Sequence, residues 1–203
     1  MKYILFFPLL SILFFTSCQQ KPKTITNENG RIIKVPSDYS TIGSAVWNSS
    51  DGDWVIIAPG TYYEMKIDVD KSITISSEWK LTLDESKIEE TIIDSRDSIL
   101  FNIMKDDIEI SGLKIINGDH PLNITARATI KNNHFTGNLD AMSFEGSGGG
   151  YVGFNTVEND RDDGIDLDIR LGGQNRGSNI IVENNTIINS NDDGLLQRQG
   201  GFH

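Results

Sequence analysis

The sequence predicts an all-β protein that folds as a parallel β-solenoid, and three observations favour this class. Short alternating strands recur along the chain, their apolar positions fall into columns, and asparagine recurs at the turns. Segments that begin at Ile108, Thr129, Tyr151 and Ile181 can be written beneath one another. Their equivalent apolar positions then lie 20, 22 and 30 residues apart. Repeats of this length are typical of coils that contact only their neighbours.

The repeated positions define the interior and one turn of this solenoid. Asparagine suits the turn because it tolerates left-handed backbone and because its amide can bond to the next coil. A leucine-rich repeat would need a leucine ladder that is missing, and a β-sandwich would not keep four segments in register. The apolar columns are Ile110, Ile130, Val152 and Val182; Ile115, Phe135, Val157 and Ile187; and Leu122, Met142, Ile165 and Leu195, and the turn column is Asn133, Asn155 and Asn185.

The chain begins with a targeting segment that we exclude from the fold. Met1-Lys2 is a positive start, and the apolar run Tyr3–Phe15 is short for a stable membrane span. We predict a lipoprotein signal peptide over residues 1–17, with a transmembrane anchor as the alternative. Cys18, the only cysteine in the chain, follows "FFTS", and this junction resembles the bacterial lipobox.

The lipobox resemblance implies that Cys18 carries lipid and forms the mature N-terminus. Several acyl chains would give stable anchoring, since each buried methylene contributes roughly 0.8 kcal/mol. Residues 18–30 then form a polar tether, and residues 31–203 form the solenoid domain. We therefore expect an exported protein that is lipid-anchored to a bacterial membrane, on its periplasmic or cell-surface side.

The chain is strongly acidic, with a formal net charge of −11. Removal of residues 1–17 takes away one lysine, so the mature chain carries −12. This sign disfavours nucleic acid and other bare polyanions as partners. An acidic ligand would need a local positive charge. We expect the protein to act as a monomer.

The domain opens with a short helix and then turns into strands. Ser40 can cap a helix whose residues Ile42, Ala45 and Val46 fall on one face. A strand over residues 54–58 follows, and Pro59-Gly60 turns the chain again. No helical period of useful length is found beyond this point.

The stretches "YSTIGSAVWN", "GDWVIIAPGTYYEM" and "KSITIS" resemble the entry of the right-handed parallel β-helix proteins related to pectin and pectate lyases. The resemblance covers residues 35–199. It implies a right-handed parallel β-helix whose first coil is capped by a short helix. It says little about activity, because this fold hosts lyases, hydrolases, esterases and binding proteins.

Aspartates gather just before the third apolar column. Stacked coils lie about 4.8 Å apart, and like charges at that spacing repel by about 1 kcal/mol. Calcium, which takes six to eight oxygen ligands, would relieve this repulsion. The alternative is a set of solvated Asp-Asp-Gly turns. The column is His120, Asp140, Asp163 and Asp193, with Asp162 and Asp192 beside it, and we predict that Asp140, Asp162, Asp163 and Asp166 bind the cation.

The segment "DDGIDL" resembles the calcium site of the family-9 polysaccharide lyases. Asp162, Asp163 and Asp166 match its aspartates, and Asp140 in "LDAMSF" matches the aspartate of the preceding coil. The resemblance implies Ca²⁺ as cofactor and an acidic polysaccharide such as pectate as partner. Calcium on the uronate carboxylate would acidify the C5 proton, and a base would start β-elimination.

The base is where the resemblance fails. The family uses a lysine on a later coil, whereas the last lysine here is Lys131, upstream of the aspartates. Arg170 and Arg198 are the candidate catalytic residues, with ion pairing to the aspartates as their alternative role, since arginine normally stays protonated. His120 and His134 are poorer candidates, and we expect His134 on an exposed face.

The end of the chain offers no amphipathic cap, although solenoid ends need one. We expect a truncated piece of a longer enzyme; an end covered by a partner is the alternative. The polar insertion at residues 170–179 is either a substrate-contacting loop or a flexible one.

Three functions remain open. The first is a calcium-dependent lyase, or a fragment of one, that cleaves uronate polysaccharide. The second is a non-catalytic β-helix surface lipoprotein that binds glycan. The third is a glycoside hydrolase of the same fold, which would need paired carboxylates about 6.5–9.5 Å apart.

Overall fold

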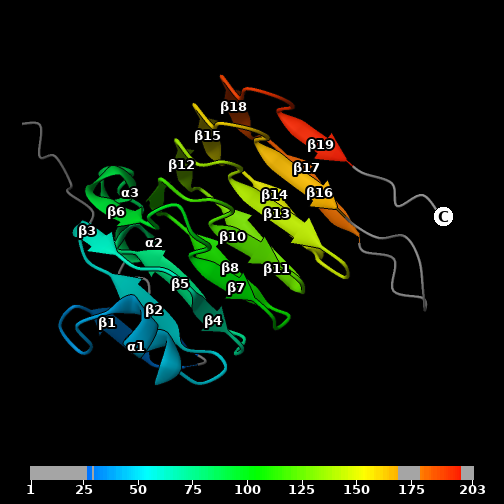
Figure 1. Ribbon diagram of the computed structural model, residues 1–203. Helices are drawn as coiled ribbons and strands as arrows, with labels where there is room; N and C mark the ends of the chain where they lie inside the picture. The colour runs from blue at the N-terminus through cyan, green and yellow to red at the C-terminus, as the bar shows by residue number, and fades with distance from the viewer. Residues whose placement is uncertain (1–26, 29, 169–178, 198–203) are drawn as a thin grey trace, which may run out of the picture.

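The computed structural model describes residues 27–28, 30–168 and 179–197. Over these residues the chain winds into stacked coils that form three parallel sheets, here called A, B and C (Figure 1). From β2 onward each described coil has one strand in each sheet, whereas the first coil adds only β1, in sheet A. Sheet A contains β1 (Ile32–Val35), β2 (Trp54–Ile57), β5 (Thr74–Ser77), β8 (Ile108–Ser111), β11 (Arg127–Lys131), β14 (Gly149–Gly153) and β17 (Ile180–Glu183). Sheet B contains β3 (Gly60–Tyr63), β6 (Thr91–Asp94), β9 (Lys114–Ile116), β12 (His134–Thr136), β15 (Thr156–Glu158) and β18 (Thr186–Ile188). Sheet C contains β4 (Ile67–Val69), β7 (Phe101–Ile103), β10 (Leu122–Ile124), β13 (Met142–Glu145), β16 (Ile165–Asp168) and β19 (Leu195–Gln197).

The predicted apolar columns are confirmed by the strand register. Ile130 pairs with Ile110 on one side and with Val152 on the other, and Phe135 pairs with Ile115 and Val157 in the same way. The third column stacks Leu122, Met142, Ile165 and Leu195 in sheet C. Apart from Leu195, which is 48% exposed in the last described coil, these side chains belong to the buried core, a continuous stack of Ile, Val, Leu, Met and Phe. Phe101, Phe135 and Phe144 are among its largest fully buried members.

The predicted capping helix is present as α1 (Ile42–Trp47), and it buries Ile42, Ala45 and Val46. The prediction of Ser40 as its cap was wrong. Thr41 has the extended backbone of an N-cap residue, and its Oγ1 accepts a hydrogen bond from Ser44 N at 3.1 Å. Glu64 also accepts bonds from Ile42 N and Gly43 N, at 2.6 and 2.9 Å. This second cap comes from the next coil and could not be read from local sequence.

Two short helices interrupt the coil between β5 and β6, and the sequence analysis did not predict them. They are α2 (Trp79–Thr82) and α3 (Ser86–Glu90), and α3 packs against β6 and β9 on the outside of sheet B. Helices of four or five residues show no useful periodicity and depend on tertiary packing. Of the helices that the structure describes, none has the length and apolar character needed to cross a membrane.

The turn from sheet A to sheet B is held by an asparagine ladder, as predicted. The Asn155 Oδ1 accepts from Asn133 N at 3.0 Å, and the Asn185 Oδ1 accepts from Asn155 N at 3.0 Å. The Asn155 side chain also donates to Ile130 O at 2.9 Å. Each amide therefore pairs backbone groups that the stacking of coils removes from water.

Replacing Asn155 by alanine should lower the free energy of unfolding by roughly 2–4 kcal/mol, because Asn133 N and Ile130 O would be left buried and unpaired. Asn123→Ala is the matched control. The Asn123 side chain makes a single 3.3 Å bond to Asn102 on the partly exposed outer face of sheet C, so its loss should cost less than about 1 kcal/mol. Urea unfolding measures the free energy of unfolding of both variants. Equal losses in the two variants would contradict the conclusion that the asparagine ladder stabilises the turn.

Candidate cation site

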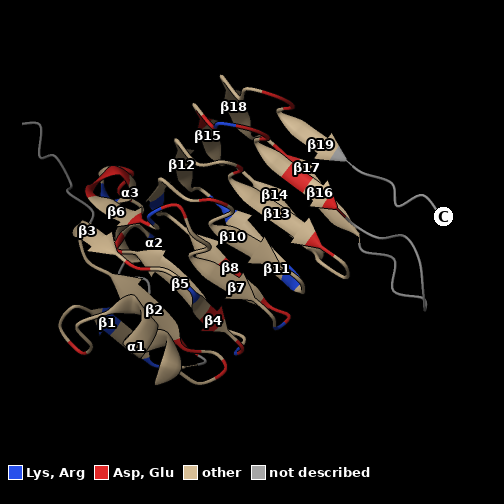
Figure 2. Ribbon diagram, in the orientation of Figure 1, with Lys and Arg blue, Asp and Glu red and all other residues tan. Residues whose placement is uncertain are grey.

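Of the four predicted ligands, Asp140, Asp162 and Asp163 lie in the turns that lead from sheet B into sheet C, and Asp166 lies in the strand β16 that follows. Figure 2 shows acidic residues between β15 and β16 and again between β18 and β19. These turns belong to successive coils, since β16 pairs with β19. Residues 30 positions apart in the sequence therefore lie side by side.

The predicted aspartate column is confirmed, and it is a hydrogen-bonded ladder. Asp163 N donates to Asp140 Oδ1 at 2.9 Å, and Asp193 N donates to Asp163 Oδ1 at 3.0 Å. Asp140 is 4% exposed and Asp163 is 2% exposed. One oxygen of each carboxylate thus replaces water for a backbone N–H between coils, which gives these two aspartates a structural role whatever else they do.

Three aspartates bring carboxylate oxygens together at the upper end of this ladder. Asp162, Asp163 and Asp192 each offer an oxygen, and these atoms lie within 4.8 Å of one another. We call this group the aspartate cluster. Asp192 was noted beside the column but was not among the predicted ligands, because the motif resemblance covers only one coil and its predecessor.

The structure places the other two predicted ligands beside this group. Asp140 lies one coil below, and its Oδ2 is 3.5 Å from His120 Nε2. Asp166 lies in β16, where it pairs in register with Ser143 and Leu196 on neighbouring strands. The grouping of close oxygens found among the described residues contains neither Asp140 nor Asp166.

Burial and repulsion between like charges raise the pKa values of two carboxyls in this ladder, those of Asp163 and Asp140. Burial raises the pKa of Asp163 above its usual range, and the charges of Asp162, Asp192 and Asp193 raise it further. Burial also raises the pKa of Asp140; the hydrogen bond from Asp163 N and the nearby His120 oppose this effect, and the charges of Asp163 and Asp162 add to it. A raised pKa means that the folded protein disfavours the charged form of the carboxyl. A bound cation would reverse this effect.

The arginine within this acidic stretch is directed elsewhere. Arg161 bonds to Asp97 Oδ1 at 3.0 Å, and its guanidinium also donates to the carbonyls of Asn138 and Gly118. The donor set of the cluster consists of hard carboxylate oxygens, which calcium or magnesium prefers. Three carboxylates leave room for further oxygen ligands around a calcium ion. The residues present therefore fit the predicted cation.

Several predicted residues lie outside the described part of the chain. These are the candidate bases Arg170 and Arg198, the lipidation residue Cys18 and nearly all of the insertion at residues 170–179.

Both of these histidines contact carboxylates. His120, at the base of the aspartate ladder, contacts Asp140. The expectation that His134 decorates an exposed face was wrong, because its side chain is 15% exposed and is held between Glu89 and Glu158. The sequence analysis did not predict α3, and this helix carries the Glu89 that contacts His134.

Residues 72–202 match the family described as a right handed beta helix region, and this stretch exceeds half of the chain. The chain belongs to the right-handed β-helix family. This membership and the three parallel sheets confirm the predicted all-β fold. The likeness to family-9 lyases at Asp162, Asp163 and Asp166 stays a prediction. Searches of curated proteins and of solved structures gave no match.

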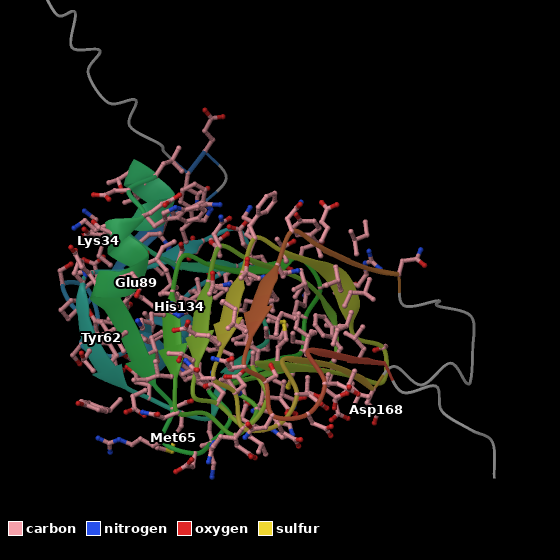
Figure 3. All side chains as sticks on the ribbon, turned by 90° about the horizontal axis from the view of Figure 1, so that it is seen from above. Lys34, Tyr62, Met65, Glu89, His134 and Asp168 are labelled. Carbon is pink, nitrogen blue, oxygen red and sulfur yellow. The ribbon has the colours of Figure 1, made fainter. Side chains whose placement is uncertain are left out.

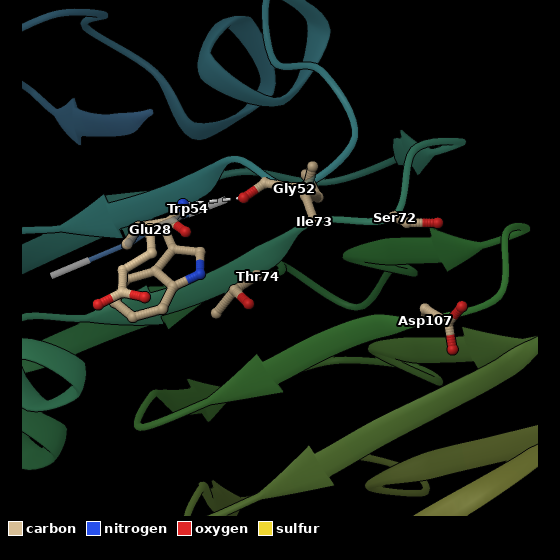
Figure 4. Close-up of a pocket in the computed structure, with 8 residues that line it drawn as sticks. Glu28, Gly52, Trp54, Ser72, Ile73, Thr74 and Asp107 are labelled. Carbon is tan, nitrogen blue, oxygen red and sulfur yellow. Dashed lines mark hydrogen bonds between the residues drawn. The ribbon is translucent and has the colours of Figure 1, made fainter. Parts of the chain in front are cut away.

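Two grooves on this β-helix lie away from the aspartate cluster. One, of about 420 Å³, is near the first coils, and Trp54, Ser72, Thr74 and Asp107 are among its lining residues (Figure 4). The other, of about 290 Å³, lies beside α3 and includes His134 and Phe154. Neither lining set contains a member of the aspartate cluster.

Asp160 belongs to a further ladder of this β-helix. Gly118 N donates to Asn138 Oδ1 at 2.8 Å, and Asn138 N donates to Asp160 Oδ1 at 3.0 Å. In the described part of the chain the Asp160 Oδ2 is buried without a hydrogen-bond partner. Burial raises the pKa of Asp160 to about 6. The charged carboxylate therefore destabilises this turn.

Replacing Asp160 by asparagine should stabilise the protein at neutral pH. The folded pKa of about 6 exceeds the unfolded value of about 3.9, so the stability contributed by this carboxyl is present below pH 3.9 and is lost as pH rises through 6. Asp160→Asn should thus gain roughly 1–3 kcal/mol above about pH 6 and little below about pH 4. Urea unfolding at several pH values, in the presence of a chelator, measures this gain in the free energy of unfolding. Asp68→Asn, on the outer face of β4, is the control. A gain at Asp160→Asn that does not depend on pH would refute the explanation.

Proposed function

We propose that this β-helix protein is a calcium-dependent polysaccharide lyase, or a fragment of one, that acts on uronate-containing polymers. The observation that carries the proposal is the aspartate cluster, in which two successive coils bring three carboxylates within 4.8 Å. Closely spaced carboxylates, one of which (Asp163) has a pKa raised by burial, are typical of functional sites. An acidic protein would bind an acidic polymer through such a cation.

Asp162, Asp163 and Asp192 would hold the calcium ion, and Asp140 would support Asp163 through its bond to Asp163 N. The bound ion supplies Lewis acidity to a carboxylate next to the scissile bond. The turn backbone fixes the Asp163 side chain, since its Oδ1 accepts a hydrogen bond from Asp193 N at 3.0 Å. The site is therefore held in place before substrate arrives.

β-Elimination also needs a base that removes the C5 proton of the uronate. The electron pair released at C5 forms the C4–C5 double bond while the glycosidic oxygen leaves C4. Arg170 and Arg198 remain our proposed bases. Among the described residues, His120 is a further candidate, because it contacts Asp140 next to the cluster and imidazole is a common general base.

The alternative is a non-catalytic β-helix that binds acidic glycan through the same cation. One observation favours it. Lys131, the last lysine in the sequence, is paired with Glu109 at 3.1 Å on sheet A and is not at the cluster. An inverting glycoside hydrolase has less support, because the cluster's oxygens lie within 4.8 Å, closer than the spacing of about 6.5–9.5 Å that inverting enzymes use.

Calcium titration of the purified protein by calorimetry tests the site. We expect saturable binding that Asp163→Asn and Asp192→Asn each weaken by at least about tenfold, which is about 1.4 kcal/mol. Asp163→Asn keeps the acceptor for Asp193 N, so the fold should survive. Asp68→Asn, on the outer face of β4, is the matched control and should bind as the unmodified protein does.

The lyase step is then tested by ultraviolet absorbance of the unsaturated product from polygalacturonate and alginate. Calcium-dependent product formation supports the enzyme. Calcium and polymer binding without product supports the non-catalytic alternative. If calcium does not bind, the aspartates are structural turns and both proposals fail.

We also propose that the protein is exported and anchored to a bacterial membrane through lipid on Cys18. The support is the sequence junction alone. Cys18→Ala should move the protein from the membrane fraction to the soluble fraction and should prevent incorporation of labelled fatty acid. Unchanged fractionation without label in either form would contradict lipidation.

A further inference from the structure

A left-handed phenylalanine occupies a turn position where neighbouring coils carry glycine or asparagine. The residue that follows the sheet A strand is Gly112, Asn132, Phe154 and Asn184 in four successive coils, with φ values of 65°, 54°, 59° and 55°. Glycine and asparagine adopt this conformation readily, whereas a bulky side chain does so at a cost. The fold alone therefore favours asparagine at residue 154.

The strained backbone puts an aromatic ring into solvent. Phe154 is 54% exposed, and it lines the groove of about 290 Å³ between α3 and the outer face of sheet B. The groove also exposes polar groups from three coils. Its other lining residues are Glu85, Ile88, Glu89, Asn132, Asn133, His134 and Thr156.

The polar floor of this groove is rigidly held. His134 Nδ1 is 2.6 Å from Glu89 Oε1, and His134 Nε2 is 3.1 Å from Glu158 Oε1. Lys114 Nζ donates to the other oxygen of Glu89 at 2.6 Å. Glu89 and His134 lie on the side of the solenoid that carries α3, away from Asp168 at the end of β16 (Figure 3). None of the residues that line the groove belongs to the aspartate cluster.

The geometry points to a binding site for a neutral pyranose unit of a glycan, with Phe154 as the platform and the side chains of Asn132, Thr156 and Glu89 as hydrogen-bonding groups. The apolar C–H face of a sugar ring packs on an aromatic ring, and its hydroxyls need donors and acceptors at the edge. A few placed polar groups beside an apolar surface are typical of small-ligand sites.

Charge decides between sugar classes. The described residues that line the groove include two glutamates and no lysine or arginine, so a uronate or a phosphate would be repelled. The negative charge of Glu89 is already paired with Lys114 and His134. The groove therefore attracts a cationic ligand only weakly. These charges therefore favour a neutral sugar ring over an acidic or a cationic ligand.

The test is saturation-transfer NMR on the purified protein with neutral tetrasaccharides of glucose, mannose and galactose, in the presence of a chelator. We expect at least one of them to bind through its ring protons. Phe154→Asn should weaken this binding by at least about tenfold and should leave the melting temperature unchanged or higher, because asparagine is the residue of the flanking coils. Phe154→Trp should retain binding.

Tyr63→Asn is the matched control, since Tyr63 is another exposed aromatic residue (57%) on sheet B, and it should not change binding. Tetragalacturonate and choline are the acidic and cationic counter-probes. Binding of either counter-probe alone, no binding of any neutral tetrasaccharide, or binding that survives Phe154→Asn would overturn the proposal. Since the chelator removes calcium, these outcomes are independent of whether the aspartate cluster binds it.

Discussion

The whole structure depends on one constraint: stacked coils remove the backbone N–H groups of their turns from water, so each must find a partner on a neighbouring coil. In the turn from sheet A to sheet B, Asn133, Asn155 and Asn185 meet this need. In the turn from sheet B to sheet C, Asp140 and Asp163 do. Continuous apolar columns between the turns then provide the burial that stabilises the stack.

The same constraint gives the aspartates two roles. A carboxylate has two oxygens, and the ladder of Asp140 and Asp163 uses one of each. Asparagine would serve the backbone equally well without charge, as it does in the other turn. The negative charge is made costly by burial at Asp163 and is not needed for the turn, and the cation that we propose at Asp162, Asp163 and Asp192 would offset this cost.

Elements that depend on contacts between coils were beyond sequence reasoning. Asp192 joins the cluster across a step of 30 residues, and the motif that identified Asp162 and Asp163 did not reach that far. The helices α2 and α3 are too short for periodicity, so the partners of His134 could not be foreseen. Ser40 and Thr41 are both good caps by type, and only the backbone angles distinguish them.

The sequence by itself determined the all-β solenoid, its three apolar columns and the stacking of Asn133 with Asn155 and of Asp140 with Asp163, because a repeat places equivalent residues at equivalent points of every coil. The tertiary structure alone decided which carboxylate oxygens approach one another, that Arg161 pairs with Asp97, and that Phe154 faces a groove beside α3. Repetition specifies the column in which a residue lies. The direction of its side chain and the neighbours supplied by insertions depend on packing that no single coil contains.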